Sequence, residues 1–306
     1  MKKFVLGLFL ILLVSGCAGM PDIFKGIIPG TGSNVNKTEL SSDLIVIQNI
    51  NVIPTPPIFA GDEFTVSFEI KNQDDINDVT TTWELFDMGL CKNKSSQSST
   101  VDTKDFFPLQ TELVEWSFDA PGNDEIASLP NKCPIRFKVN YTFNATSQID
   151  VNIISKDRLS QLQKAGTPPS FIPNLVIGRG PVKIDLSFGA TLPARNESSL
   201  PMFITVEDKG TGLLGVIPTN SLSIAVPSNF SSVSCGDRFI CSGNVCTNNV
   251  TIPMIKKSSP QLRCSLTTPT STAINNIERT YFITASLEYG YEITGESVID
   301  IKPTST

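Results

Sequence analysis

The chain has 306 residues, contains no histidine and carries a formal net charge of −6. The lack of histidine excludes Ser-His-Asp and Cys-His catalysis and any zinc site that uses imidazole. The acidic balance, with no basic stripe, argues against a surface for nucleic acid or anionic lipid. Carboxylate-based catalysis and a calcium site stay open, since neither needs imidazole.

Turn-forming residues divide the chain into short strand-like runs. The 21 Pro and 20 Gly are scattered between short apolar segments, a pattern typical of an all-β sandwich or barrel. A length of 306 residues suits about two domains with cores of their own. We therefore expect an all-β protein of two domains.

Residues 1–17 have the layout of a secretory signal peptide. Lys2 and Lys3 precede an apolar run from Phe4 to Val14, which is shorter than the ~20 residues that span a bilayer. An uncleaved N-terminal anchor or a buried strand is the alternative. The motif Val14-Ser15-Gly16-Cys17 resembles the lipobox of prokaryotic lipoproteins, and this resemblance implies that Cys17 is acylated and becomes the mature N-terminus.

The first domain is predicted between residues 44 and 154. Residues 18–43 show little periodicity and are expected to form a flexible tether. From residue 44 onward apolar and polar residues alternate, which predicts strands with one buried and one wet face. About seven such short strands over roughly 110 residues is the number expected of an immunoglobulin-like sandwich.

A short helix is predicted after this sandwich. Ser155 is a suitable N-cap, Gly166 is a suitable end, and prolines follow up to Pro173. We expect residues 155–174 to be a helical, proline-rich connector and residues 175–306 to form a second immunoglobulin-like sandwich. Tyr141 and the strand after it match Tyr291 and its strand at a constant offset of 150, which indicates either duplication or a shared strand pattern.

The run from Gly61 to Asn72 follows a proline-bearing approach, and from Phe64 it alternates without a fault until it ends in Asn. It resembles the CARDB family of cell-adhesion-related domains on prokaryotic surface proteins. The resemblance implies immunoglobulin-like surface modules with a role in adhesion, display or scaffolding. It brings no catalytic residue to this chain.

Six cysteines remain when Cys17 is set aside, an even number that predicts disulfides in an exported chain. Cys91 follows one strand and Cys133 opens another that should lie antiparallel beside it in the sandwich, so we predict that these two are joined. A turn-rich link between Cys241 and Cys246 predicts a hairpin with a local disulfide. Cys235 then remains to pair with Cys264. A four-cysteine zinc site is the rival, although the spacings lack C-x-x-C knuckles; the four residues concerned are Cys235, Cys241, Cys246 and Cys264.

The glycine-rich run from Gly210 to Gly215 spells a dinucleotide fingerprint. That fingerprint requires its last glycine to open a helix, whereas Pro218 follows shortly and prevents helix growth. We interpret the run as a loop.

Residues 72–78 concentrate oxygen ligands after a strand. Calcium favours such ligands, but Asp and Asn are also ordinary turn formers and the EF-hand spacing is absent. A solvated turn is the preferred interpretation, and the weak metal candidates are Asp74, Asp75, Asn77 and Asp78.

Seven sequons make the chain a candidate glycoprotein. They lie at Asn36, Asn93, Asn140, Asn144, Asn196, Asn229 and Asn249.

Three functions remain open. The first is a lipid-anchored cell-surface protein with a non-catalytic binding, adhesion or scaffolding role, whose partners are other envelope proteins or surface polysaccharide. The second is an accessory or assembly subunit of a cell-envelope complex that docks by edge strands. The third is a carboxylate-based hydrolase, for which no positioned acid pair is visible. We expect an extracytoplasmic location, no catalysis and no cofactor.

Overall fold

The computed structural model describes residues 35–39, 43–94, 102–126, 131–275 and 277–304. The expected signal peptide, with Cys17, and most of the expected tether lie outside these residues. The described chain consists mainly of strands packed as sandwiches, which confirms the all-β prediction. No helix within it has the length and apolar character needed to cross a membrane.

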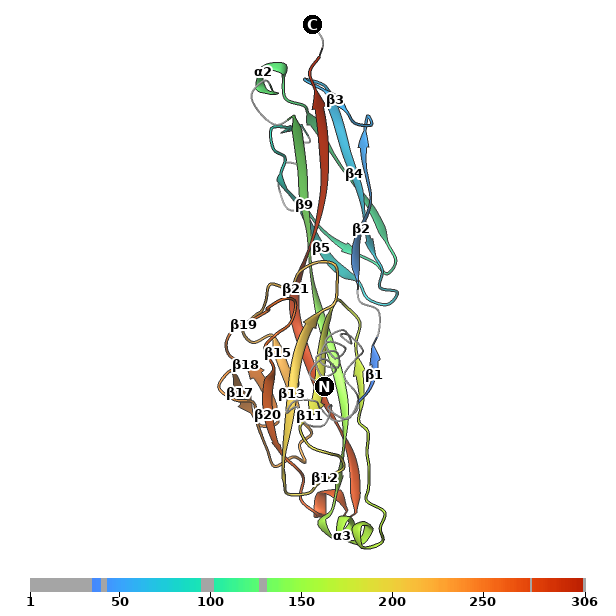
Figure 1. Ribbon diagram of the computed structural model, residues 1–306, viewed down its shortest axis with the longest axis vertical. Helices are drawn as coiled ribbons and strands as arrows, with labels where there is room; N and C mark the ends of the chain where they lie inside the picture. The colour runs from blue at the N-terminus through green and yellow to red at the C-terminus, as the bar shows by residue number, and fades with distance from the viewer. Residues whose placement is uncertain (1–34, 40–42, 95–101, 127–130, 276, 305–306) are drawn as a thin grey trace, which may run out of the picture.

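Two very long strands run through the whole elongated body (Figure 1). β9 (Lys132–Ile154) and β21 (Glu278–Lys302) pair antiparallel without interruption from Lys132 opposite Asp300 to Ile154 opposite Glu278. We call this pair the central ribbon. Both strands keep a period-two pattern of burial over their length, and β9 ends at Ile154, where the predicted first domain also ends.

The upper half of the molecule in Figure 1, which we call the upper lobe, consists of residues 43–94, 102–126, 131–141 and 291–304. Its first sheet is a four-stranded one, and the second is the upper arm of the ribbon with three flanking strands. The first sheet has the order β2 (Ile45–Ile53), β4 (Glu63–Asn72), β8 (Thr111–Asp119), β6 (Lys92–Asn93). The ribbon is flanked by β5 (Val79–Asp87), β7 (Asp102–Phe106) and β3 (Ile58–Phe59), and α2 (Asn123–Ile126) lies at the end.

The lower lobe consists of residues 35–39, 142–275 and 277–290. Here the ribbon continues into β1 (Asn36–Glu39), β10 (Asn174–Ile177) and β12 (Ala194–Arg195) beside β9, and into β15 (Leu222–Ala225), β18 (Val245–Asn248) and β17 (Phe239–Ser242) beside β21. The opposing sheet has the order β11 (Val182–Phe188), β13 (Ser199–Asp208), β20 (Leu262–Thr267), β16 (Ser232–Ser234). Smaller elements are β14 (Val216–Ile217) paired with β19 (Ile252–Pro253), α3 (Lys156–Lys164) and the 3₁₀ turn η2 (Thr272–Ile274).

The two sheets of the upper lobe meet in an aromatic core. The Phe68 ring stacks on the Phe137 ring at a centroid distance of 3.9 Å, and Trp116 meets Phe137 edge to face at 5.5 Å. Phe68 and Phe137 are fully buried and Trp116 is 4% exposed. Phe137 belongs to the ribbon and the other two to the facing sheet, so this contact fixes the ribbon to the sandwich.

The helix predicted from residue 155 is present, but it does not connect the lobes. Ser155 caps α3 by accepting a hydrogen bond from Arg158 N at 3.2 Å, and α3 lies at the far end of the lower lobe (Figure 1). The chain passes between the lobes through β9 and returns through β21. Residues 44–154 and 175–306 are therefore not two consecutive domains, because each lobe needs an arm of both long strands.

The end of the expected tether also differs from the prediction. Residues 36–39 form β1, which pairs in parallel with β10 at the edge of the lower lobe. Lys37 also forms an ion pair with Asp185. The segment shows little sequence periodicity, and it becomes a strand because the exposed edge of β10 offers unpaired backbone groups.

Candidate functional site

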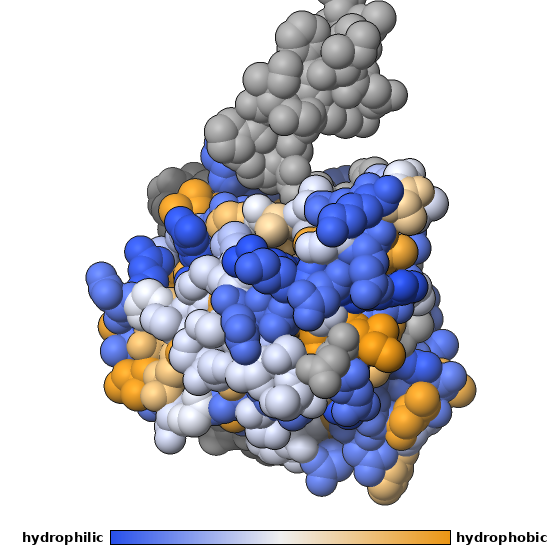
Figure 2. Space-filling model, turned by 90° about the horizontal axis from the view of Figure 1, so that it is seen from below, coloured by the Kyte–Doolittle hydropathy of each residue, from blue (hydrophilic) through white to orange (hydrophobic). Residues whose placement is uncertain are grey.

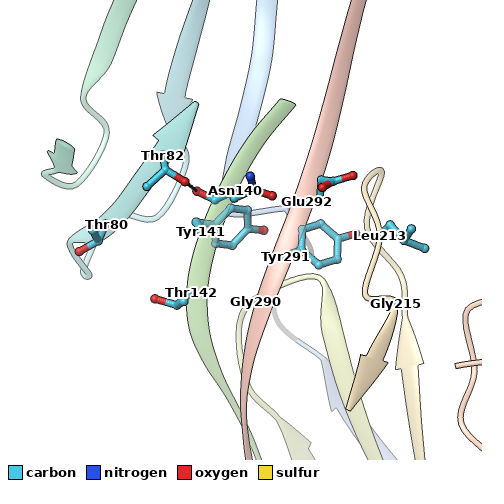
Figure 3. Close-up of a pocket in the computed structure, with 10 residues that line it drawn as sticks. All are labelled: Thr80, Thr82, Asn140, Tyr141, Thr142, Leu213, Gly215, Gly290, Tyr291 and Glu292. Atoms are coloured by element: carbon cyan, nitrogen blue, oxygen red, sulfur yellow. Dashed lines mark hydrogen bonds between the residues drawn. The ribbon is translucent and has the colours of Figure 1, made fainter. Parts of the chain in front are cut away.

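A groove of about 410 Å³ lies at the waist, where the lobes meet. We call it the waist groove (Figure 3). It is formed by β5, both strands of the central ribbon and the glycine-rich loop of the lower lobe. The lining residues are Thr80, Thr82, Asn140, Tyr141, Thr142, Leu213, Gly215, Gly290, Tyr291 and Glu292. Its volume falls in the range of about 300–1,000 Å³ typical of small-molecule sites.

The polar lining follows from strand alternation. Thr82 lies opposite Asn140, and Asn140 lies opposite Glu292, so these side chains share the outward face of three neighbouring strands. The Thr82 hydroxyl donates to the Asn140 carbonyl at 3.4 Å (Figure 3). Glu292 is the only carboxylate of the lining, and Lys138 lies 3.9 Å from it. The groove therefore offers mainly neutral hydrogen-bonding groups.

A glycine and an exposed leucine give the groove its shape. A Cβ atom at Gly290 would meet no other atom within 4 Å, so the hollow exists where this strand lacks a side chain. Leu213 exchanges backbone hydrogen bonds with Glu292 at 2.8 and 3.2 Å. It stays 53% exposed and provides an apolar rim.

A buried carboxylate anchors the glycine-rich loop beneath this rim. The Asp208 side chain is fully buried; it accepts hydrogen bonds from the Tyr291 hydroxyl at 2.7 Å and from the amides of Gly210 and Leu214. Burial and the hydrogen bond to Asp208 both raise the pKa of Tyr291, which keeps the hydroxyl protonated as a donor. Residues 210–215 carry no helix, which confirms the prediction that this run is a loop.

A second hydroxyl at the groove is buried without a partner. The Tyr141 hydroxyl makes no hydrogen bond within the described part of the chain, and the residue is only 3% exposed. Burial, and then the neighbouring Tyr289 and Tyr291, raise the pKa of Tyr141, so the group stays neutral. An unsatisfied buried hydroxyl costs about 1–3 kcal/mol of stability.

We expect Tyr291→Phe to lower the free energy of unfolding by about 1.5 kcal/mol, because a carboxylate loses its hydrogen-bond donor while two amides still bind it. Urea unfolding of the full chain measures this. Tyr281→Phe is the matched control on the same strand, since Tyr281 donates to the neutral carbonyl of Ala273 at 3.2 Å and should cost about 0.5–1 kcal/mol. Equal losses in both variants would contradict the assigned role of Asp208.

The oxygen-rich loop after β4 is a mostly exposed turn, as predicted, and its buried residue Asp74 binds a guanidinium. Asp74 accepts hydrogen bonds from Ile76 N and from the Asn77 side chain, and Arg179 of the lower lobe donates to it at 3.1 Å. Asp75 pairs with the same arginine. Burial alone would raise the pKa of Asp74, but these hydrogen bonds and the charge of Arg179 outweigh it and lower the pKa. Arg179 thus lies where a metal cation was considered, and its ion pairs with Asp74 and Asp75 link the lower lobe to the upper lobe. Within the described chain, Asp78 forms no ion pair with this arginine.

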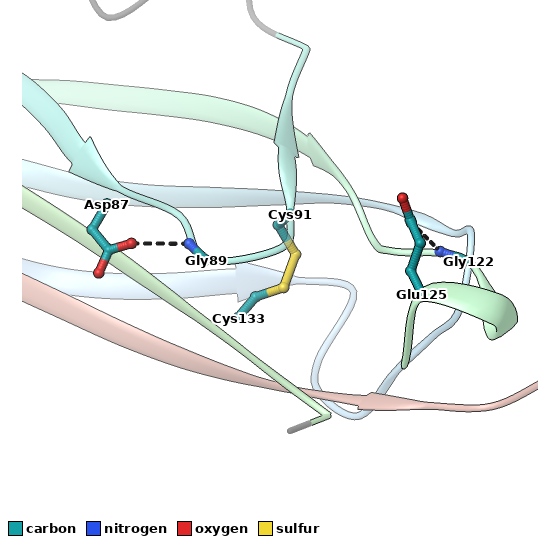
Figure 4. Close-up of a disulfide and its surroundings, with 6 residues drawn as sticks. All are labelled: Asp87, Gly89, Cys91, Gly122, Glu125 and Cys133. Carbon is teal, nitrogen blue, oxygen red and sulfur yellow. Dashed lines mark hydrogen bonds between the residues drawn. A yellow bond between two sulfur atoms is a disulfide. The ribbon is translucent and has the colours of Figure 1, made fainter. Parts of the chain in front are cut away.

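All three predicted disulfides are present. Cys91 is bonded to Cys133, with a Cα separation of 5.9 Å (Figure 4). The strands before and after this bond, β5 and β9, pair antiparallel as expected. In the lower lobe β17 and β18 form the predicted hairpin, in which Cys241 lies directly opposite Cys246 and is joined to it by a disulfide. The lower-lobe pairs are Cys241 with Cys246 and Cys235 with Cys264.

The sequons differ in accessibility. Asn196 is 5% exposed and its Oδ1 atom accepts a hydrogen bond from Lys156 N, so a sugar there is incompatible with this fold. Asn140 lies in the waist groove. Asn36, Asn144 and Asn229 are exposed, whereas Asn93 and Asn249 are partly buried.

Sequence reasoning did not identify the waist groove as a site. It treated Asn140 only as a sequon and did not single out Thr82 or Glu292. The available signal was Gly290, a glycine inside an otherwise alternating strand, which often marks a close approach or an unfilled position.

Comparisons with known proteins give no family. A scan against models of known protein families finds no match, and a search of curated proteins also finds none.

Among solved structures, the chain is similar to WR4, an MSP family member of C. elegans, at 11% identity over 43% of this chain and 98% of that one, with a TM-score of 0.19. It also matches red sea bream transglutaminase at 9% identity over 83% of this chain and 30% of that one, with a TM-score of 0.21. A third match is the chitinase ChiA74 from Bacillus thuringiensis at 12% identity, over 73% and 27% of the chains, with a TM-score of 0.19. The chain spans less than a third of each enzyme, and likenesses this weak carry no argument about function.

Proposed function

We propose that this protein is an exported, lipid-anchored surface protein that binds a neutral, hydroxyl-rich ligand, such as a segment of surface polysaccharide, in the waist groove without catalysis. The observation that carries the proposal is the lining of the groove. Threonine hydroxyls and the Asn140 amide offer donors and acceptors, and Leu213 offers an apolar edge. A few placed polar groups beside an apolar surface are the usual composition of a small-molecule site.

The construction of the groove supports binding rather than chemistry. Its floor belongs to paired strands of the central ribbon, and a rigid floor binds with a smaller entropic cost than a loop would. Glycoside hydrolysis uses two carboxyl groups about 5–9.5 Å apart, whereas Glu292 is the single carboxylate of this lining. Glu292 instead supplies an acceptor for ligand hydroxyls.

Filling the groove tests this function. Gly290→Trp should abolish retention of polysaccharide extracted from the envelope of the producing cells, because the new side chain starts where a Cβ meets no atom within 4 Å and fills the hollow. Val298→Trp is the matched control on the same strand, since Val298 is 49% exposed and lies outside the lining. Undiminished retention by Gly290→Trp would sink the proposal. Loss of retention in both variants would do so as well.

The membrane anchor is tested separately. Cys17→Ala should lose a palmitate label and move the protein from the membrane fraction to the soluble one, since lipidation requires this sulfur. Cys91→Ser with Cys133→Ser should keep both the label and the location. Labelling of Cys17→Ala at the wild-type level would exclude the proposed anchor.

A docking subunit of an envelope complex is the second candidate. The edge strand β17 supports it, because its only ladder partner in the described chain is β18 and Ile240 on it is 64% exposed. Open edges bind extended partner segments by strand addition. A pull-down from solubilised membranes separates the candidates: a stoichiometric envelope protein that Ile240→Lys fails to recover favours docking, and recovery of polysaccharide alone favours the groove.

A further inference from the structure

The two disulfides of the lower lobe lie against each other. The Sγ atoms of Cys235, Cys241 and Cys246 all lie within 4.8 Å of one another. Cys264 is bonded to Cys235 and so belongs to the same group. Four sulfur atoms from separate points of the chain therefore meet at one place, which we call the sulfur cluster.

The sulfur cluster lies between the two sheets of the lower lobe. Cys241 and Cys246 stand opposite each other on β17 and β18, which belong to the sheet of the central ribbon. Cys264 lies on β20 and Cys235 directly follows β16, and both strands belong to the opposing sheet. Figure 1 shows β17, β18 and β20 beside one another at this side of the lobe. Each disulfide thus links neighbours within one sheet, while the sulfur atoms face each other between sheets.

We propose that these four cysteines form a zinc site when their disulfides are reduced. Zinc binds four thiolates tetrahedrally with Zn–S distances of about 2.3 Å, which places the sulfur atoms about 3.8 Å apart. The Cys235 sulfur lies within 4.8 Å of the other two and needs to approach them by no more than about 1 Å, whereas the sulfur atoms of Cys241 and Cys246 move apart to that separation once their bond is broken. Cys235 and Cys264 separate to a similar distance once their bond is broken.

The surroundings suit a closed structural site. Cys246 and Cys264 are fully buried and Cys235 is 4% exposed, whereas Cys241 is partly exposed and gives a reductant access. A site with four protein ligands and no open position holds zinc structurally, not catalytically. The metal would join the two sheets, a link that neither disulfide makes.

The chemistry is balanced by an external dithiol. Reduction of the two disulfides takes four electrons and four protons, which two dithiol molecules supply while they become cyclic disulfides. Zinc then binds the four thiolates and releases the four thiol protons to solvent. Oxidation by a disulfide acceptor reverses both steps and expels the ion, so the lower lobe is cross-linked under reducing and oxidising conditions alike.

Cobalt(II) serves as a spectroscopic probe for the site. The full chain carrying Cys17→Ala is reduced without oxygen and titrated with cobalt. We expect one ion per chain, with the absorption of thiolate-to-cobalt charge transfer, and displacement by zinc. Addition of Cys91→Ser with Cys133→Ser should leave this absorption unchanged, and Cys264→Ser should remove it. Absence of the absorption in the reduced chain, or its loss with Cys91 and Cys133, would overturn the proposal.

Alkylation of the unmutated sulfur cluster gives a second measurement that does not depend on whether Cys264→Ser folds. Zinc added to the reduced chain should protect the four cluster cysteines from iodoacetamide, while Cys91 and Cys133 react as they do without metal. Peptide mass mapping identifies the labelled positions. Equal labelling of all six cysteines with and without zinc would also overturn the proposal, and the oxidised chain should bind no zinc because bonded sulfur is not a thiolate.

Discussion

Replacing Cys91 and Cys133 together by serine should lower the free energy of unfolding by about 4 kcal/mol in the chain-entropy account of disulfides. The bond closes a loop with a sequence separation of 42 residues. It fixes the segment after β5 to the start of β9, at the end of the upper lobe where few ladder pairs remain (Figure 4). Urea unfolding of the full chain measures the effect. A fragment ending near Ile154 is unsuitable, because it lacks the upper arm of β21 that pairs with β9.

The hairpin disulfide provides the matched control. Cys241→Ser with Cys246→Ser removes the same number of sulfur atoms but opens a loop with a sequence separation of only 5. The same relation gives a loss of about 2 kcal/mol. If removal of the Cys91–Cys133 bond lowers the free energy of unfolding by no more than removal of the Cys241–Cys246 bond does, the Cys91–Cys133 bond does not restrain the unfolded chain as described.

Gly295→Ala should destabilise the protein by about 3 kcal/mol, near the upper end of the range for overpacking a core. Gly295 lies directly opposite Phe137 on the central ribbon, and a Cβ there would overlap the Cζ and Cε2 atoms of that ring. The ring has no room to withdraw, because it is stacked on Phe68 and is fully buried. Unfolding monitored by circular dichroism measures the loss.

Gly290→Ala is the control on the same strand. Its Cβ would meet no atom within 4 Å and its backbone does not adopt a positive φ, so alanine should be neutral or add up to about 1 kcal/mol by reducing the freedom of the unfolded chain. A loss in this variant as large as that in Gly295→Ala would contradict the packing described for the ribbon. Restoration of stability in Gly295→Ala by Phe137→Leu would support it.

The disulfides were predictable from the sequence because their partners lie on adjacent strands. The alternating strands before Cys91 and after Cys133 are expected to be antiparallel neighbours in a sandwich, and the turn between Cys241 and Cys246 predicts a hairpin. The structure contains both arrangements. The meeting of the two lower-lobe disulfides was not predictable, because it depends on how two separate sheets pack.

The domain organisation was predicted less well. Alternation predicted about seven short strands between residues 44 and 154, but it does not report whether two alternating segments are one strand or two. The match between Tyr141 and Tyr291 suggested duplication, whereas these residues are direct cross-strand partners near the middle of the central ribbon. A shared ribbon places similar side-chain requirements on both of its strands, and this produces the same match.

Polar residues gave the least reliable expectations. Alternation predicted strands with one solvent-facing side, yet on β11 the polar residue Lys183 is 2% exposed and donates to the Gly178 carbonyl at 3.0 Å. Burial lowers the pKa of this lysine. Asp74 likewise met Arg179 from another part of the chain instead of solvent. A sequence pattern states which face of a strand is polar, but not what packs against that face.

The sequence by itself determined the all-β class, the strand positions, the capped helix α3 and the pairing of the cysteines. These features depend on local period, turn chemistry and the neighbourhood of consecutive strands, all of which act over short stretches of chain. Only the tertiary structure decided that one ribbon serves both lobes, that Arg179 joins them, and that a groove opens over Gly290. Those features arise between segments more than a hundred residues apart, such as Asn140 and Glu292, whose approach depends on the packing of the whole molecule.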